Sequence, residues 1–308
     1  MLTIFTHTKA FKGHVGVIQR NAISQWTRLR PKPEILLFGD EEGTAEIAQE
    51  FGLRHIPEVE RSEYGTPLLS DLFAKAHAYA SHNTLCYVNA DIMLLGDFMK
   101  AVREVVSWRA RFLMVGERRD VDLDEPAIYE SPDQEARLRV LVVHQNRPIT
   151  PLAIDYFVFP RGLFPNFPPF AIGRPTWDNW FLWKARRSSV ALVDASEVVF
   201  AVHQNHDYSH HPQGWQGICH DEEADQNRKL TGRHSRNIGD ATHKLTDDGI
   251  NYNYGRLPLQ IKRAVRSAWW ELLRVTGPVR HPLGLREKKI ADFLERIGLR
   301  STHETDNI

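Results

Sequence analysis

The chain has 308 residues, of which 42% are hydrophobic and 25% are charged, and its formal net charge is zero. This composition is typical of a folded globular protein, and the length suffices for one large domain with an accessory part or for two domains. The balanced charge does not indicate a nucleic-acid-binding protein. Two cysteines, Cys86 and Cys219, provide neither a disulfide framework nor a cysteine-based zinc site, which is typical of a reducing compartment.

The N-terminal segment begins directly in a strand-like apolar run at residues 2–6. It lacks the basic segment and the following apolar stretch of a signal peptide. No apolar run in the sequence approaches the roughly 20 residues that cross a bilayer as a helix. We therefore expect a cytoplasmic protein that is not integral to a membrane.

Strand and helix patterns alternate along the first half of the chain. Short apolar runs predict strands at 2–6, 34–38, 53–56 and 85–88. Apolar residues at helical spacing predict helices at 15–29, 43–51, 68–79 and 97–106. Alternating units of this length predict a doubly wound, mostly parallel α/β sheet with right-handed crossovers. Ligands bind in such sheets beyond the carboxyl ends of the strands, where this sequence has Thr6, Asp40 and Asp91.

The second half of the chain is less regular. Its pattern predicts strands at 112–115, 155–159 and 198–202, and helices at 134–143 and 179–187. Residues 160–175 are rich in proline, phenylalanine and glycine, which predicts an ordered loop packed by aromatic side chains.

The character of the sequence changes again between residues 256 and 300. This stretch has eleven lysines or arginines against four aspartates or glutamates, with tryptophans and leucines between them. We expect a C-terminal helical extension at 251–308, after a larger domain at 1–250. The basic charge suits peripheral contact with the anionic inner face of a membrane or with a lipid-linked molecule. Packing of the aromatic residues on the protein core is the alternative.

The strongest chemical signal lies at residues 86–94, where an apolar strand runs into Asp91 and apolar character then resumes. A carboxylate in this position is held by a rigid element at the edge of the sheet. Such oxygen ligands suit Mg²⁺ or Mn²⁺, which neutralise the phosphates of a substrate. A strand-terminal turn or a helix cap is the structural alternative for the same aspartate.

A second signal is the segment 203–211, which holds four histidines directly after the predicted strand at 198–202. The side chains of His203, His206, Asp207 and His210 are all able to coordinate a metal ion. A solvated polar loop is the alternative interpretation. The acidic run at 120–124 lacks the glycine and the final glutamate of an EF-hand, so we interpret it as a solvated loop.

A third signal is Asp178, which lies between Trp177 and Trp180 at the predicted start of a helix. A carboxylate beside apolar rings has its pKa raised toward the working pH, as a general base requires, and the indole rings would stack on a sugar. The alternative is a helix-capping aspartate whose neighbouring tryptophans pack in the core.

The three segments follow a first half of alternating strands and helices, and their order along the chain resembles that of the GT-A glycosyltransferases. The most similar group is the bacterial enzymes of family 2. The resemblance covers residues 1–250. It implies a GT-A-type doubly wound sheet flanked by helices, with a nucleotide-binding half at 1–110 and an acceptor and metal half at 111–250. It also implies transfer of a sugar, with inversion, from a nucleoside-diphosphate sugar to a hydroxyl of a saccharide or lipid-linked acceptor, as in polysaccharide biosynthesis.

The same resemblance assigns nucleotide-sugar contacts to residues at the ends of the strands. Thr6 and Asp40 match the positions that contact the nucleotide, and Asp155 lies where such enzymes line the sugar pocket. The family's Asp-x-Asp metal motif matches residues 89–91, with Asn89 in place of the first aspartate. Asp91 then keeps the direct contact to Mn²⁺ or Mg²⁺, whereas the contact made by the first position is weakened.

The remaining roles fall in the second half of the chain. The family carries a histidine that completes the metal shell, which matches His203, with His206 as the second candidate. It also carries a later carboxylate that acts as the catalytic base, which matches Asp178.

Two other functions stay open at this stage. A metal-dependent hydrolase would use His203, His206, Asp207 and His210 with a metal-bound water as nucleophile, but it leaves Asp91 without a role. A non-catalytic protein that binds a sugar nucleotide is the other, since Asn89 departs from the catalytic motif. P-loop and Rossmann glycine motifs are absent from the sequence.

Overall fold

The computed structural model describes residues 1–123, 131–145, 153–206, 214–256 and 261. The chain divides into two compact units, Met1–Asn253 and Tyr254–Ile308. The second unit is described only at the short 3-10 helix Tyr254–Arg256 and at Ile261, so the predicted helical extension and its membrane contact lie almost wholly outside the described residues. Among the described helices, none has the length and apolar character to cross a membrane.

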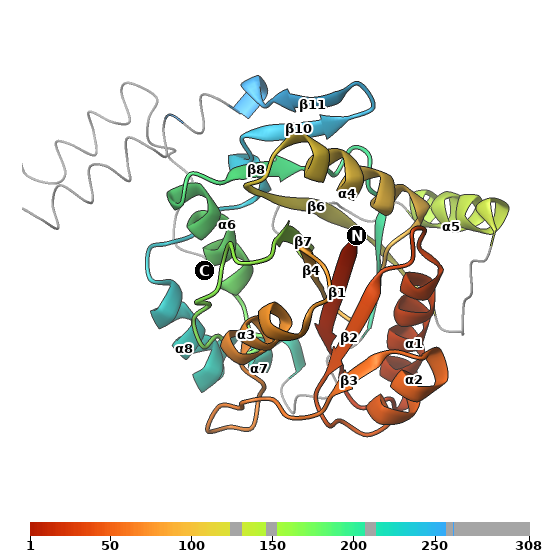
Figure 1. Ribbon diagram of the computed structural model, residues 1–308. Helices are drawn as coiled ribbons and strands as arrows, with labels where there is room; N and C mark the ends of the chain where they lie inside the picture. The colour runs from red at the N-terminus through yellow and green to blue at the C-terminus, as the bar shows by residue number, and fades with distance from the viewer. Residues whose placement is uncertain (124–130, 146–152, 207–213, 257–260, 262–308) are drawn as a thin grey trace, which may run out of the picture. The chain divides into compact units, whose positions relative to one another are not determined.

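The first unit is built on one mixed sheet with helices on both faces (Figure 1). The strands follow the order β11-β10-β8-β6-β7-β4-β1-β2-β3. Their bounds are β1 (Leu2–His7), β2 (Glu34–Phe38), β3 (Arg54–Ile56), β4 (Thr84–Val88), β6 (Phe112–Val121), β7 (Ile154–Pro160), β8 (Ala191–Asp194), β10 (His243–Thr246) and β11 (Gly249–Tyr252). The helices are α1 (Gly13–Arg28), α2 (Thr44–Phe51), α3 (Leu69–Tyr79), α4 (Gly96–Trp108), α5 (Pro132–Gln145), α6 (Trp177–Arg187), α7 (Gly214–His220) and α8 (Glu222–Thr231).

The first half of the unit follows the predicted pattern closely. Strands β3, β2, β1 and β4 lie side by side and parallel. Along the chain, α1 connects β1 to β2, α2 connects β2 to β3, and the segment with α3 connects β3 to β4. Gly52 ends α2 in the left-handed conformation expected of a C-cap. The carboxyl ends of β1, β2 and β4 therefore meet at one edge of the sheet.

Two strands interrupt the parallel arrangement. Strand β7 runs antiparallel between β4 and β6, and β11 runs antiparallel at the edge beside β10. All other pairs along the main path are parallel. The predicted α/β fold class, a doubly wound and mostly parallel sheet flanked by helices, is confirmed. The predicted domain boundary at residue 250 falls inside β11, so the β10–β11 hairpin belongs to the first unit.

A second, smaller β-ladder brings the segment of Asp91 next to the segment of His203. Strand β5 (Ile92–Met93) pairs antiparallel with β9 (Ala201–Gln204), and β9 pairs parallel with the end of β6. We expected this strand at 198–202, and that boundary is wrong. The backbone turns at Val198, whose N–H donates to the carbonyl of Ala195 at 3.1 Å, so pairing begins later and includes His203.

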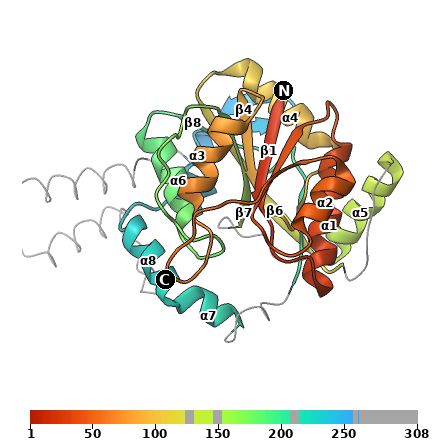
Figure 2. The same ribbon diagram turned by 60° about the horizontal axis from the view of Figure 1, so that its bottom comes forward.

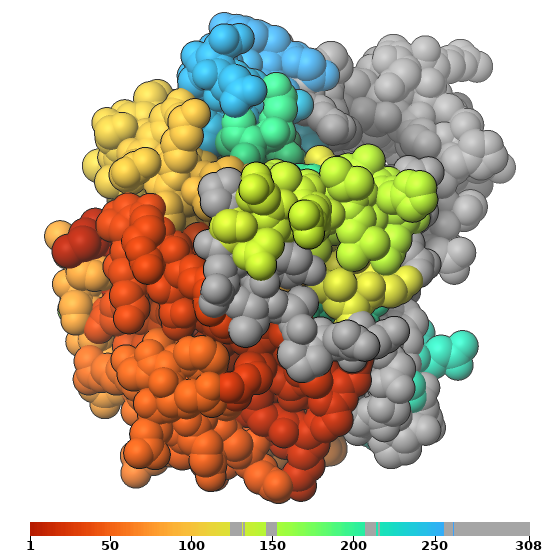
Figure 3. All heavy atoms as spheres, turned by 90° about the vertical axis from the view of Figure 1, so that its right-hand side faces the viewer, coloured from red at the N-terminus to blue at the C-terminus, as the bar shows by residue number. Residues whose placement is uncertain are grey.

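The sheet separates two apolar cores. Helices α3 and α6 lie on one side of the sheet and α1, α2 and α5 on the other (Figure 2). Side chains of α1, α2, α4 and α5 form one core, and side chains of α3 and α6 form the other. Figure 3 looks onto α5, which lies on the surface near α1 and α4. Helix α1 also supports the small ladder, because Trp26 donates its indole N–H to the carbonyl of Ile92 at 2.9 Å. The amide of Gln204 is held by Asn21 and by the carbonyl of Ile18, each at 2.8 Å.

Candidate metal and catalytic site

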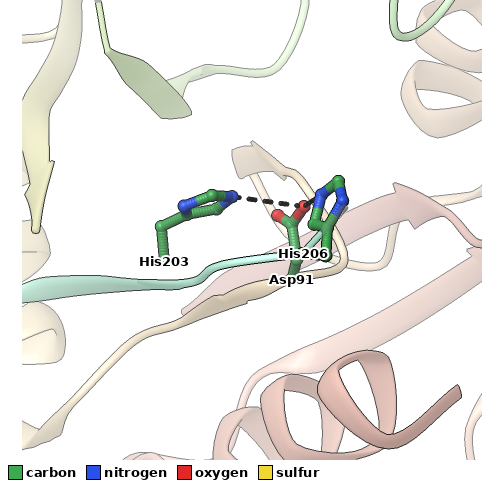
Figure 4. Close-up of side chains that lie close together, drawn as sticks. All are labelled: Asp91, His203 and His206. Carbon is green, nitrogen blue, oxygen red and sulfur yellow. Dashed lines mark hydrogen bonds and ion pairs between the residues drawn. The ribbon is translucent and has the colours of Figure 1, made fainter. Parts of the chain in front are cut away.

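Asp91, His203 and His206 converge at the edge of the small ladder (Figure 4). Asp91 directly precedes β5, and Ile92 pairs with His203 in the antiparallel register of β5 and β9. The carbonyl of Asp91 also accepts hydrogen bonds from the backbone and side-chain amides of Gln204, at 3.3 and 3.2 Å. Strand pairing thus holds two distant segments together and puts one potential ligand atom of each of the three residues within 4.8 Å of the others.

The geometry of the three side chains fits a metal ion. The Nε2 atoms of His206 and His203 lie 3.3 and 3.7 Å from Oδ2 of Asp91. The other carboxylate oxygen, Oδ1 of Asp91, is buried and has no hydrogen-bond partner among the described residues. Buried polar atoms are normally paired, so an unpaired carboxylate oxygen beside two imidazoles fits a position that a cation would complete.

The electrostatics keep the carboxylate ionised. Burial alone raises the pKa of Asp91, but the hydrogen bond from His206 and the positive charges of His203, His206 and Lys9 together lower it well below its usual range. Three protein ligands leave coordination positions for water or substrate. Two imidazoles in the donor set suit Mn²⁺ better than Mg²⁺, which prefers oxygen ligands throughout.

Asp120 orients His203 from the side opposite to Asp91. The two residues are register partners on β6 and β9, and Nδ1 of His203 lies 2.9 Å from Oδ1 of Asp120. Because a carboxylate only accepts, Nδ1 of His203 donates to Asp120 and Nε2 is left on the side that faces Asp91, where a neutral imidazole would offer its lone pair to a bound cation. Sequence reasoning placed Asp120 in a solvated acidic loop, and this is wrong, since the residue lies within β6.

Arg118 and Asp155 extend this contact network to the other side of the site. Asp155, 8% exposed, accepts from the amide of Asn89 at 2.6 Å and from Nη1 of Arg118 at 2.8 Å. Nε of Arg118 lies 3.0 Å from the carboxylate of Asp120. Sequence reasoning missed Arg118. The available signal was its spacing of two from Asp120, which puts both side chains on one face of a strand.

Asp178 lies in the first turn of α6 and is half-buried. Burial raises its pKa to about 7, the negative charge of Asp155 adds to this, and hydrogen bonds from backbone N–H groups and the charge of Arg118 oppose it. Its neighbours Trp177 and Trp180 are each 7% exposed and pack against Tyr87, Phe157, Phe167 and Phe170. This matches the packing interpretation of the two tryptophans rather than sugar stacking.

The predicted nucleotide contacts lie at the ends of β1 and β2. Thr6 is fully buried, so a direct contact from its side chain would require this strand end to open. Asp40 is exposed and forms an ion pair with Arg61 at 2.6 Å. A cavity of about 470 Å³ beside it is lined by Asp40, Arg61 and Lys75, together with residues 57–60.

A half-buried ion pair lies next to this cavity. Nε2 of His7 lies 3.0 Å from Glu41, which also pairs with Arg61 at 2.9 Å. Burial raises the pKa of Glu41, but the hydrogen bond and charge of His7 and the hydrogen bond from Arg61 outweigh it and bring the pKa to about 2. Gly39 permits the arrangement, because its φ is +103° and a Cβ there would lie 2.1 Å from the carboxylate of Glu41.

No family model and no curated protein matches the chain. Among solved structures, the glucosyl-3-phosphoglycerate synthase of M. tuberculosis is 14% identical, over 76% of this chain and 80% of that chain, with a TM-score of 0.45. Residues 1–349 of S. aureus TarS are 11% identical, over 66% and 60%, with a TM-score of 0.44. The mannosyltransferase PcManGT of Pyrobaculum calidifontis, in complex with GDP-Man and Mn²⁺, is 15% identical, over 65% and 56%, with a TM-score of 0.41. The function of this chain has to be inferred from its own side chains.

Proposed function

We propose that the chain is a metal-dependent glycosyltransferase, which moves a sugar from a nucleoside-diphosphate sugar to an acceptor hydroxyl. The observation that carries the proposal is the convergence of Asp91, His203 and His206, with one buried carboxylate oxygen of Asp91 unpaired among the described residues. These side chains would hold Mn²⁺, or Mg²⁺ less well. A bound divalent cation supplies positive charge against the diphosphate as it departs.

Asp178 is the proposed catalytic base. Its carboxylate takes the proton of the acceptor hydroxyl, whose oxygen attacks the anomeric carbon as the bond from that carbon to the diphosphate oxygen breaks. A pKa of about 7 suits this role, because the group is partly ionised at neutral pH and still takes up a proton readily. Asp155 is a poorer base, since its two carboxylate oxygens already accept from Asn89 and Arg118. A single displacement of this kind inverts the anomeric configuration.

The nucleotide would lie across the ends of β1 and β2. The ion pairs of Asp40 and Glu41 with Arg61, and the cavity beside them, support binding of the base and ribose there. Contacts from Thr6, Asn89 and Asp155 to the sugar nucleotide stay predictions. The saccharide or lipid-linked acceptor and the cytoplasmic location also stay predictions.

A metal-dependent hydrolase is the second candidate, because two histidines and a carboxylate with open coordination positions also suit Zn²⁺ and a nucleophilic water. The version inferred from the sequence relied on Asp207 and His210, which lie outside the described residues. The proximity of Asp91 to both histidines counts against that version, which gave the strand-end carboxylate no role.

A thermal-shift screen tests the proposal and separates the two candidates. Nucleoside diphosphates and their sugar derivatives are added with Mn²⁺, with Zn²⁺ and with no metal, since a ligand of the folded state raises the melting temperature. The transferase predicts stabilisation by at least one nucleoside diphosphate that requires Mn²⁺. Stabilisation by Zn²⁺ alone, without any response to nucleotides, would favour the hydrolase and contradict the proposal.

A further inference from the structure

A continuous line of polar contacts joins the two segments that carry the proposed metal ligands. It begins at Asn89, two residues before Asp91, and ends at His203 on β9. The intermediate side chains are Asp155, Arg118 and Asp120, at separations of 2.6 Å from Asn89 to Asp155, 2.8 Å from Asp155 to Arg118, 3.0 Å from Arg118 to Asp120 and 2.9 Å from Asp120 to His203.

Arg118 occupies the centre of this line. Its guanidinium donates a hydrogen bond from Nη1 to Asp155 and forms an ion pair with Asp120, whose carboxylate lies 3.0 Å from Nε without accepting a hydrogen bond from it. The charges of Asp155, Asp120 and Asp91 raise the pKa of Arg118 above its usual value, although burial opposes this. A planar fork of N–H groups can hold two carboxylates in a fixed relation, whereas a lysine ammonium acts as a single point charge.

Asp155 is equally constrained by its partners. Its two oxygens accept from two separate donors, Asn89 and Arg118. An asparagine at position 155 would offer one acceptor oxygen and one donor nitrogen, so one of the two contacts would be lost. A carboxylate at position 89 would stand about as close to Asp155 as the amide does, at 2.6 Å, and would repel it. The asparagine at position 89 is thus explained by its neighbour and need not signal a lost activity.

We propose that Arg118 is a positioning residue of the metal site, which fixes the loop of Asp91 relative to the strand of His203 through Asp155 and Asp120. The inference rests on the proposed metal site. Arg118 does not bind the metal itself. It fixes the positions of the residues that bind the metal. Loss of a contact of this kind typically lowers the metal affinity roughly tenfold to a hundredfold.

Charge and positioning predict different outcomes for substitutions at this residue. If only charge mattered, Arg118→Lys would leave the affinity for a cation unchanged, and Arg118→Gln would raise it, because a positive charge near the site is removed. A positioning role predicts that both variants bind the cation more weakly than the wild type. Neither lysine nor glutamine can bridge Asp155 and Asp120 with the planar fork of arginine.

The experiment is a titration of Mn²⁺ against the full chain, followed by electron paramagnetic resonance of the free ion. The variants are Arg118→Lys and Arg118→Gln, with Arg139→Lys as the control, because Arg139 is also partly buried and paired with an aspartate, Asp97, away from this network. Circular dichroism verifies that each variant is folded. Two variants are used so that the test stands if one of them does not fold.

We expect the affinity for Mn²⁺ to fall at least about tenfold in both Arg118 variants and to stay unchanged in the control. Wild-type affinity in Arg118→Lys, or tighter binding in Arg118→Gln, would overturn the positioning role while leaving the metal site intact. Failure of the wild-type chain to bind Mn²⁺ would instead refute the metal site of the proposed function, and this inference with it.

Discussion

Nε2 of His206 lies 3.3 Å from Oδ2 of Asp91, although 115 residues separate the two in the sequence. The antiparallel pairing of β5 with β9 creates this proximity, since it aligns Ile92 with His203 and leaves Asp91 and His206 just beyond the paired residues. Strand register therefore fixes the backbone of Asp91 and His203 relative to each other without a bound ligand.

Asp91→Ala should abolish stabilisation by Mn²⁺ and nucleoside diphosphate while the chain still folds. The side chain lies at the rim of the sheet and contacts His206, whereas the hydrogen bonds that join Asp91 to β9 are accepted by its backbone carbonyl and stay in the variant. The melting temperature with and without Mn²⁺ measures the effect. Asp194→Asn, which alters another buried carboxylate on β8, is the control and should respond to Mn²⁺ as the wild type does. Undiminished stabilisation in Asp91→Ala would refute this ligand assignment.

The two histidines should differ in their contribution. His203 is 5% exposed, lies within β9 and is oriented by Asp120, whereas His206 follows the strand. We expect His203→Ala to weaken Mn²⁺ binding more than His206→Ala does, and Asp120→Asn to weaken it by roughly tenfold to a hundredfold. Calorimetric titration with Mn²⁺ measures all three variants. A larger loss at His206 would reverse the assignment.

The pair Asn89 and Asp155 predicts a specific rescue. Asn89→Asp should lower the melting temperature, because two carboxylates about 2.6 Å apart repel each other. One kcal/mol corresponds to about 2–4 °C for a unit of this size, so we expect a decrease of at least this order. Adding Asp155→Asn places a donor amide at 155 opposite the acceptor carboxylate at 89. The double variant should therefore recover most of the lost melting temperature. A double variant less stable than Asn89→Asp would contradict the pairing.

The assignment of Asp178 predicts a pH-dependent rate. Below its pKa of about 7, the transfer rate should rise about tenfold for each pH unit and then level off, because only the ionised carboxylate accepts a proton. Asp178→Asn should bind the donor normally and lose roughly 10²–10⁴ in rate. Release of the nucleoside diphosphate in the presence of an acceptor measures the rate. A variant that keeps more than about a tenth of the rate would make Asp178 a structural residue.

The same residue predicts a change in stability that requires no substrate. A pKa raised from 3.8 to about 7 stabilises the fold below the unfolded-state value, and this contribution is lost as the pH rises through about 7. Relative to the wild type, Asp178→Asn should therefore gain stability as the pH rises from about 4 to about 7, and the difference should stay constant above that. Denaturant unfolding at several pH values measures this. A difference between the two proteins that does not vary with pH would argue against the raised pKa.

The sequence was sufficient for the alternating α/β pattern and for selecting Asp91, His203 and His206, which lie together in the structure. The roles of these residues and of Asp178 stay predictions. Local apolar runs reveal β1, β2 and β4, because parallel strands buried on both faces are apolar throughout. The strand around His203 was misplaced, since polar residues within β9 interrupt the apolar run on which the prediction relied. The two residues of β5 are too few to produce a pattern.

The positioning network could not be predicted, because it depends on register. Asp120 and Arg118 become neighbours of His203 and Asp155 only through the pairing of β6 with β9 and β7. The local sequence does not reveal either pairing. Without it, the charged residues at the end of β6 have the pattern of a solvated segment. A resemblance carried by motifs therefore identified the proposed ligands and missed the residues that would hold them in place.

In the proposed site, Asp91, His203 and His206 bind one divalent metal together with a nucleoside diphosphate. A crystal structure of the chain with Mn²⁺ and a nucleoside diphosphate, with anomalous diffraction to locate the ion, tests this arrangement. We expect a single anomalous peak bonded to the carboxylate of Asp91 and to Nε2 of at least one of the two histidines, with phosphate oxygens completing the shell. A nucleotide bound without metal at these residues, or Mn²⁺ bound elsewhere, would contradict it.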